Sequence, residues 1–72
     1  MKLYIELYFS SEGTPPQVII KKMKDMGFEP VVGQYDFAKE YNNPEEYAGI
    51  VKRLSKELEG TKLRYRLVTR AD

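Results

Sequence analysis

The chain has 72 residues, 12 of them basic and 11 acidic, and it contains neither cysteine nor histidine. These absences exclude disulfides, thiolate nucleophiles and imidazole chemistry, so we expect a non-catalytic protein without a metal or cofactor. The length predicts one domain over residues 1–72, and the net charge of +1 lacks the basic excess typical of duplex-binding modules.

Hydropathy and composition also indicate the compartment and the kind of organism to expect for this protein. The apolar runs are only a few residues long, which is too short to cross a membrane. The first strand pattern starts at Met1 with no signal peptide before it, which predicts a cytoplasmic protein. Abundant Lys, Glu and Arg are compatible with a thermophilic source.

Residues 2–9 predict a half-buried strand, because apolar and polar side chains alternate strictly along them. The predicted core face carries Leu3, Ile5, Leu7 and Phe9. The opposite face carries Lys2, Tyr4, Glu6 and Tyr8.

A helix is predicted over residues 15–26. Thr14 provides a polar N-cap, the two prolines that follow fit the first turn, and Gly27 ends the helix in the left-handed conformation. The apolar stripe at helical spacing is Ile19, Ile20, Met23 and Met26.

Residues 28–41 predict a β-hairpin. The first strand, 28–33, belongs at a sheet edge because Pro30 has no N–H, and Gly33 with Gln34 forms a two-residue turn. In the returning strand, 35–41, the predicted core face carries Tyr35, Phe37 and Tyr41, with the stem of Lys39 between them. The outward face carries Asp36, Ala38 and Glu40. One unbroken strand over 28–41 is the alternative, although it would be far longer than usual.

The second predicted helix, 44–59, has the same start and stop signals as the first, with Asn43 as N-cap and Gly60 after its end. Its apolar stripe is Tyr47, Ile50, Val51, Leu54 and Leu58. The last strand is predicted over 62–70, with Leu63, Tyr65 and Leu67 facing inward. Its outward residues are Arg64, Arg66, Val68 and Arg70.

The resulting order, β-α-β-β-α-β, predicts an α+β sandwich of the ferredoxin-like kind. Right-handed crossovers place both helices on one face of a four-stranded antiparallel sheet. The first and third strands become central, and the fourth lies beside the first. The strand that contains Pro30 then falls at an edge, as its missing N–H requires.

The other sheet face is not covered by the predicted helices, and the role of its exposed side chains has to be explained. They include Tyr4, Glu6, Tyr8, Arg64, Arg66 and Arg70. One interpretation is a solvated face with cross-strand pairs such as Glu6 with Arg64 or Arg66. A second is a homodimer formed through the sheet faces, since Tyr and Arg are enriched at interfaces. A third is single-stranded nucleic acid, with Tyr stacked on bases and Arg on phosphates. Catalysis by Asp36 and Glu40 is the weakest alternative, because no pocket signature accompanies them.

The segment 31–37, Val-Val-Gly-Gln-Tyr-Asp-Phe, resembles the V-x-G-x-Y-D-hydrophobic stretch of the effector-binding (RAM) domain of Lrp/AsnC-type regulators. The resemblance implies a ferredoxin-like fold, dimerisation through the sheets and a small effector bound near the hairpin. Gly33, Tyr35 and Asp36 would then lie at the effector region. The chain has no DNA-binding helix-turn-helix, so the resemblance is to a stand-alone RAM module.

Residues 3–7, Leu-Tyr-Ile-Glu-Leu, are similar to the first-strand motif of RNA-recognition motifs, with Tyr4 at the base-stacking position. That family exposes aromatic residues of the third strand, and exposing Tyr35 and Phe37 in this chain would bury Asp36 and Glu40. Burying carboxylates without partners is costly. We therefore expect a homo-oligomeric regulatory or interaction module, with RNA or single-stranded nucleic acid as the alternative partner.

Overall fold

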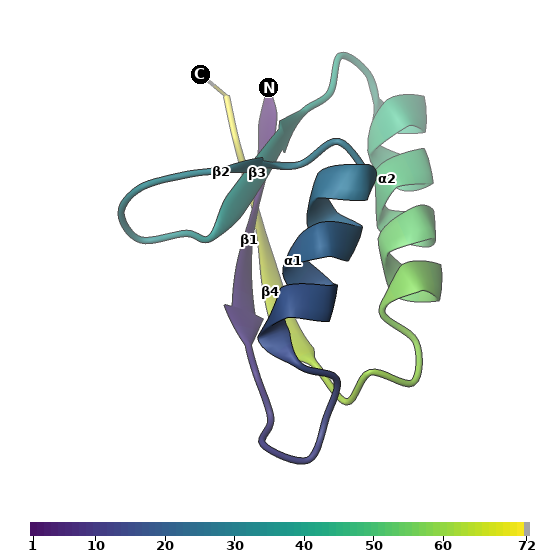
Figure 1. Ribbon diagram of the computed structural model, residues 1–72. Helices are drawn as coiled ribbons and strands as arrows, with labels where there is room; N and C mark the ends of the chain where they lie inside the picture. Colours follow the sequence, from purple (N-terminus) through teal and green to yellow (C-terminus); the bar gives the residue numbers. More distant parts are fainter. Residues whose placement is uncertain (72) are drawn as a thin grey trace.

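The computed structural model of the chain describes residues 1–71, so Asp72, the last residue of the predicted domain, lies outside the described residues. Four strands form one sheet, and two helices lie together on one side of it (Figure 1). The elements, in chain order, are β1 (Lys2–Tyr8), α1 (Pro16–Asp25), β2 (Glu29–Pro30), β3 (Phe37–Glu40), α2 (Pro44–Glu57) and β4 (Arg64–Arg70). The predicted α+β class, with a four-stranded antiparallel sheet and two helices, is confirmed.

The strands lie in the order β2-β3-β1-β4, and every neighbouring pair is antiparallel. β1 and β3 are central, as predicted. β4 pairs with the whole of β1, from Lys2 opposite Arg70 to Tyr8 opposite Arg64. Pro30 lies in the edge strand β2, where its missing N–H leaves no gap in a central ladder.

The core lies between the sheet and the helices, and the alternate residues of β1 that face the helices form part of it. Leu3 and Ile5 have no exposed surface, and neither have Ile19, Met23 and Leu54 from the helices. Two predicted core residues are instead exposed. Phe9, 42% exposed, follows the end of β1 at Tyr8, and Ile20, 37% exposed, lies one residue off the Ile19–Met23 stripe. A helix turns by about 100° per residue, so Ile20 lies well around the helix from Ile19 and outside the stripe that Ile19 and Met23 share.

The predicted two-residue hairpin turn is wrong. β2 ends at Pro30 and β3 begins at Phe37, so a loop over residues 31–36 joins them. The loop is closed by the Val31 N–H, which donates to the Asp36 carbonyl oxygen at 3.1 Å. Gly33 lies inside this loop with φ of 114°, a value that side-chain-bearing residues rarely adopt.

The two helices begin differently, although their sequences begin alike. The Asn43 side chain caps α2, because its Oδ1 accepts from the Glu46 N–H at 2.8 Å. Glu46 returns a bond, accepting at Oε1 from the Asn42 N–H at 3.0 Å. At α1 the N-cap is Pro15, and no side chain of residues 1–71 caps it, so the predicted role of Thr14 is wrong. The Thr14 N–H instead donates to the Thr61 carbonyl oxygen.

Gly27 follows the C-cap of α1 with a φ of 87°, as predicted, whereas α2 already ends at Glu57, and Gly60, with a φ of 78°, lies in the turn after it. After α1 the Gly27 N–H donates to the Lys24 carbonyl and the Phe28 N–H to the Met23 carbonyl, the two bonds of a Schellman motif. This motif turns Phe28 back onto the helix, where it is only 3% exposed.

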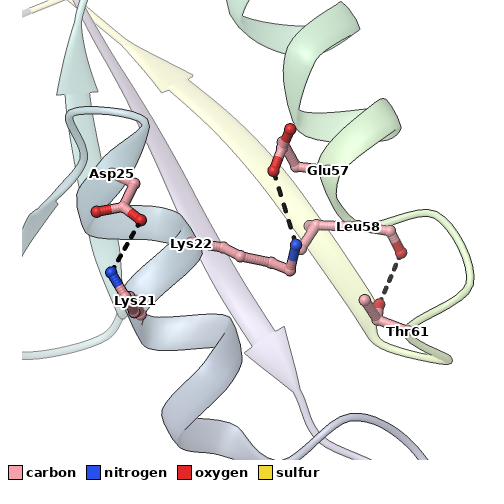
Figure 2. A network of polar contacts seen from close by, with 6 residues as sticks. All are labelled: Lys21, Lys22, Asp25, Glu57, Leu58 and Thr61. Carbon is pink, nitrogen blue, oxygen red and sulfur yellow. Dashed lines mark hydrogen bonds and ion pairs between the residues drawn. The ribbon is translucent and has the colours of Figure 1, made fainter.

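Three polar contacts lie along α1 and around the end of α2, and one of them joins the two helices (Figure 2). Lys22 of α1 reaches Glu57 of α2, with Nζ 3.7 Å from Oε1. After α2, the Thr61 hydroxyl donates to the Leu58 carbonyl oxygen at 2.6 Å, and the Thr61 side chain is buried. Lys21 pairs with Asp25 along the exposed side of α1 at 3.4 Å.

Candidate functional site

The sheet face opposite the helices is the site that the structure leaves open, and we call it the outer face. The register of β1 with β3 and β4 places Tyr4 on the same face as Ala38 and Val68. Alternate residues of the other strands share this face. The strand residues of the outer face are Lys2, Tyr4, Glu6, Tyr8, Glu29, Ala38, Glu40, Arg64, Arg66, Val68 and Arg70. The structure therefore brings together the six residues predicted for the sheet-face interface.

Glu6 lies at the centre of the first of two clusters on the outer face. Its Oε2 accepts a 2.6 Å hydrogen bond from the Tyr8 hydroxyl, and its Oε1 lies 3.6 Å from Arg66 Nη1. The Glu6 side chain is 16% exposed, and Oε1 is covered without a hydrogen bond from any described residue. Because the phenol donates to a carboxylate, the pKa of Tyr8 is raised above its ordinary value.

The second cluster is aromatic and contains a residue that was predicted to be in the core. Tyr35 packs on Tyr4 with ring centroids 4.9 Å apart and planes tilted by 33°. The Arg70 guanidinium lies over the Tyr35 ring, with Cζ 5.7 Å from the centroid. The expectation that Tyr35 faces the helices with Phe37 is therefore wrong. β3 begins only at Phe37, so strand alternation does not extend to Tyr35.

The predicted effector residues Gly33, Tyr35 and Asp36 occupy different surroundings. The Asp36 carboxylate bonds the Leu7 N–H at 2.7 Å, and its own N–H donates to the Ile5 carbonyl. Tyr35 belongs to the aromatic cluster, and no described atom outside its neighbours lies within 4 Å of a Cβ placed on Gly33. The three residues are close in the chain, but the Tyr35 ring contacts Tyr4 and the Asp36 carboxylate accepts from Leu7, so the two side chains serve different contacts.

The sequence pattern did not place Tyr35 on the outer face, although the Asp that follows it indicated that the strand alternation ends there. Asp and Asn side chains compete with main-chain groups for nearby hydrogen bonds, so an Asp at a strand end can interrupt the alternation. Asp36 interrupts it by bonding a β1 amide that β3 does not reach. Tyr35, the residue before Asp36, therefore need not follow the strand alternation, and its ring lies on the outer face.

Charges of both signs are mixed over the outer face. Four cations, Lys2, Arg64, Arg66 and Arg70, lie on the same face as three carboxylates, Glu6, Glu29 and Glu40. A mixed pattern of this kind favours a partner surface that also carries both signs.

Comparisons with protein-family models, with curated proteins and with solved structures give no match for this chain. Within residues 1–71 no group of His, Cys, Asp and Glu side chains has the arrangement of a metal site. In the same residues neither helix has the length and apolar character needed to cross a membrane.

Proposed function

We propose that the protein is a non-catalytic interaction module that forms a homodimer by apposing two copies of its outer face. The observation that carries this proposal is the pair of clusters, Tyr8–Glu6–Arg66 and Tyr4–Tyr35–Arg70, on a sheet face that the helices do not cover. Their side chains are held by one another before any partner binds, so association has less side-chain entropy to remove. Tyr and Arg are also among the residues that are enriched at interfaces.

A two-fold axis through the outer face would pair unlike charges. Two-fold symmetry sets each residue of one copy against a different residue of the other, unless that residue lies on the axis. Arginines of β4 can then meet Glu29 or Glu40 of the second copy, at the opposite edge of the sheet. Electrostatic complementarity of this kind fixes the register of a dimer.

Pairing of two β4 edges is the less favourable route to a dimer. β4 lies at the end of the strand order and pairs only with β1 among the described strands. In an antiparallel self-pairing centred on Leu67, Arg64 would stand opposite Arg70, and centred on Arg66 the two copies of Arg66 would meet. Like charges directly opposite destabilise a sheet, and such charges protect edge strands from pairing.

The ferredoxin-like assignment is part of the same proposal. The order β-α-β-β-α-β, the strand sequence β2-β3-β1-β4 and helices on one side of the sheet all support it. The RAM-like resemblance of residues 31–37 further implies regulation by a small effector near Gly33, Tyr35 and Asp36. Tyr35 would connect such an effector to the interface, because it packs on Tyr4 of the outer face.

Solution mass measured by size-exclusion chromatography with light scattering tests the dimer. We expect a wild-type dimer, and we expect Tyr4→Glu to dissociate it because the new charge would be buried against the partner. Gln17→Glu adds the same charge on exposed α1 and is expected to leave the dimer intact. A wild-type monomer at all concentrations, or a dimer that Tyr4→Glu does not weaken, contradicts the proposal.

Single-stranded nucleic acid is the second candidate, and the stack of Arg70, Tyr35 and Tyr4 is the observation that favours it. The central Glu6 carboxylate disfavours it, because it opposes phosphate. Fluorescence anisotropy with a labelled oligouridylate separates the candidates. Binding that weakens steeply with salt and is reduced by Arg70→Ala would support nucleic acid. If the protein does not bind the oligonucleotide even at low salt, nucleic acid is excluded and the interaction module remains the proposed function.

A further inference from the structure

A second open site lies on the helix side of the molecule, away from the outer face. It is a groove of about 380 Å³ between the end of α1, β3 and the part of α2 from Glu46 to Arg53. This volume falls within the range of roughly 300–1,000 Å³ that small-molecule sites occupy. Its floor is apolar, formed by Met26 and Phe28, which are 6% and 3% exposed, and by the half-buried Ile50.

Gly49 is the first of two residues in this groove that the fold alone does not explain. It lies inside α2, where glycine costs helix stability relative to alanine, yet its φ is not positive. It lies three residues after Glu46 and four before Arg53, which places the three residues on one face of the helix. No described atom outside its neighbours and the helix backbone lies within 4 Å of a Cβ placed there, so no close packing demands glycine. The missing side chain instead widens the groove.

Lys39 is the second unexplained residue. It lies opposite Leu3 and therefore on the core face of β3, where an apolar side chain would be expected. Its Nζ would be 2.6 Å from a Cβ placed on Gly27, so the ammonium lies at the carbonyl end of α1. Favourable interaction with that end of the helix holds a cation beside the groove.

Two cations and two carboxylates line the groove, and they differ in how they are engaged. Lys39 and Arg53 both line it, and neither forms a salt bridge with any residue of the described chain. The Glu46 carboxylate also lines it but is engaged with Asn42. Glu40 also lines the groove, although the register that sets it opposite Lys2 places its side chain on the outer face. Lys39 and Arg53 thus border the apolar floor as cations without an ion pair among the described residues, whereas Glu46 is hydrogen-bonded to Asn42 and Glu40 belongs to the outer face.

We propose that this groove binds a small organic carboxylate with a short aliphatic or aromatic body. The carboxylate bonds Lys39 and Arg53, and the apolar body lies on Met26, Phe28 and Ile50 in the space that Gly49 leaves. Charge-assisted bonds from a guanidinium fork orient the carboxylate, and burial of the apolar body supplies the remaining affinity. The site does not depend on the proposed dimer, because it lies on the other side of the sheet.

Titration of the ¹⁵N-labelled protein, followed by NMR, tests this proposal with hexanoate and 3-phenylpropanoate as probes. We expect saturable shifts of the Gly27, Gly49 and Arg53 amides, with a Kd on the order of 1 mM for ligands of this size. The uncharged analogue hexanamide is expected to bind roughly tenfold more weakly, because it lacks the charge-assisted bonds. Equal shifts from the acid and the amide, or no saturation at roughly ten times that concentration, would overturn the proposal.

Matched variants separate the site from a general effect on the fold. Gly49→Leu fills the groove and is expected to abolish binding, whereas Ala48→Leu adds the same side chain at the exposed neighbouring position and is expected to preserve it. Arg53→Gln is expected to weaken hexanoate binding roughly tenfold, and the exposed Lys52→Gln to leave it unchanged. Melting temperatures of all four variants confirm that they fold. Folded Gly49→Leu with wild-type affinity would contradict the assignment.

Discussion

The Oδ2 atom of Asp36 accepts a 2.7 Å hydrogen bond from the backbone N–H of Leu7, beyond the last paired residues of β1 and β3. The Asp36 N–H also donates to the Ile5 carbonyl at 3.0 Å. One residue thus extends the β1–β3 ladder with both its main chain and its side chain. This contact gives the Y-D pair of the RAM-like segment a structural role, and it leaves Tyr35 on the outer face.

Asp36→Ala is expected to lower the free energy of unfolding by about 1–3 kcal/mol, because the partly buried Leu7 N–H would lose its acceptor. Asp36→Asn keeps an acceptor oxygen and should cost less. Urea unfolding of the two variants and the wild type measures the difference. If Asp36→Ala is as stable as the wild type, the carboxylate does not support the ladder.

We expect the residues before the two helices to contribute unequally to the free energy of unfolding. Asn43→Ala removes the acceptor of the Glu46 N–H and should cost about 1 kcal/mol. Thr14→Ala should change stability little, because Thr14 uses its backbone N–H and no side chain caps α1 in residues 1–71. Thermal unfolding followed by circular dichroism compares them. Equal losses for both substitutions would mean that Thr14 also caps its helix.

The glycine after α1 is expected to resist substitution. Gly27→Ala forces a side chain into a φ of 87° and brings its Cβ against Lys39, so we expect a loss of about 1–2 kcal/mol. Gly60→Ala meets a similar φ of 78° with open space around its Cβ. The comparison by chemical denaturation isolates the Lys39 contact. A Gly27→Ala protein that is more stable than Gly60→Ala would exclude any cost from that contact.

The Tyr8–Glu6 bond predicts a pH effect. The hydrogen-bonded carboxylate raises the pKa of Tyr8, so the folded protein holds this proton more tightly than the unfolded chain. The resulting stabilisation is fully present below the unfolded pKa and is lost as the pH rises through the folded pKa. Glu6→Gln should move the pKa of Tyr8 back towards its ordinary value. NMR titration of the Tyr8 ring measures the shift, and an unchanged pKa in Glu6→Gln would mean that the Glu6 carboxylate does not cause it.

The sequence by itself determined the local features of this protein. The alternation in β1 places Leu3 and Ile5 in the core, the Asn43 cap begins α2, and Gly27 ends α1, all as expected. Pro30 also lies at the expected edge. These features depend on contacts within a few residues or on the period of a single element, which the order of residues records directly.

Only the tertiary structure decided where Tyr35 lies and which residues share the two candidate sites. The bond between Leu7 and Asp36 joins positions 29 residues apart, and it ends the alternation that would have placed Tyr35 in the core. The groove likewise depends on Lys39 and Gly49 meeting across β3 and α2. Periodicity carries no information about such long-range contacts, because each is set by the packing of separate elements against one another.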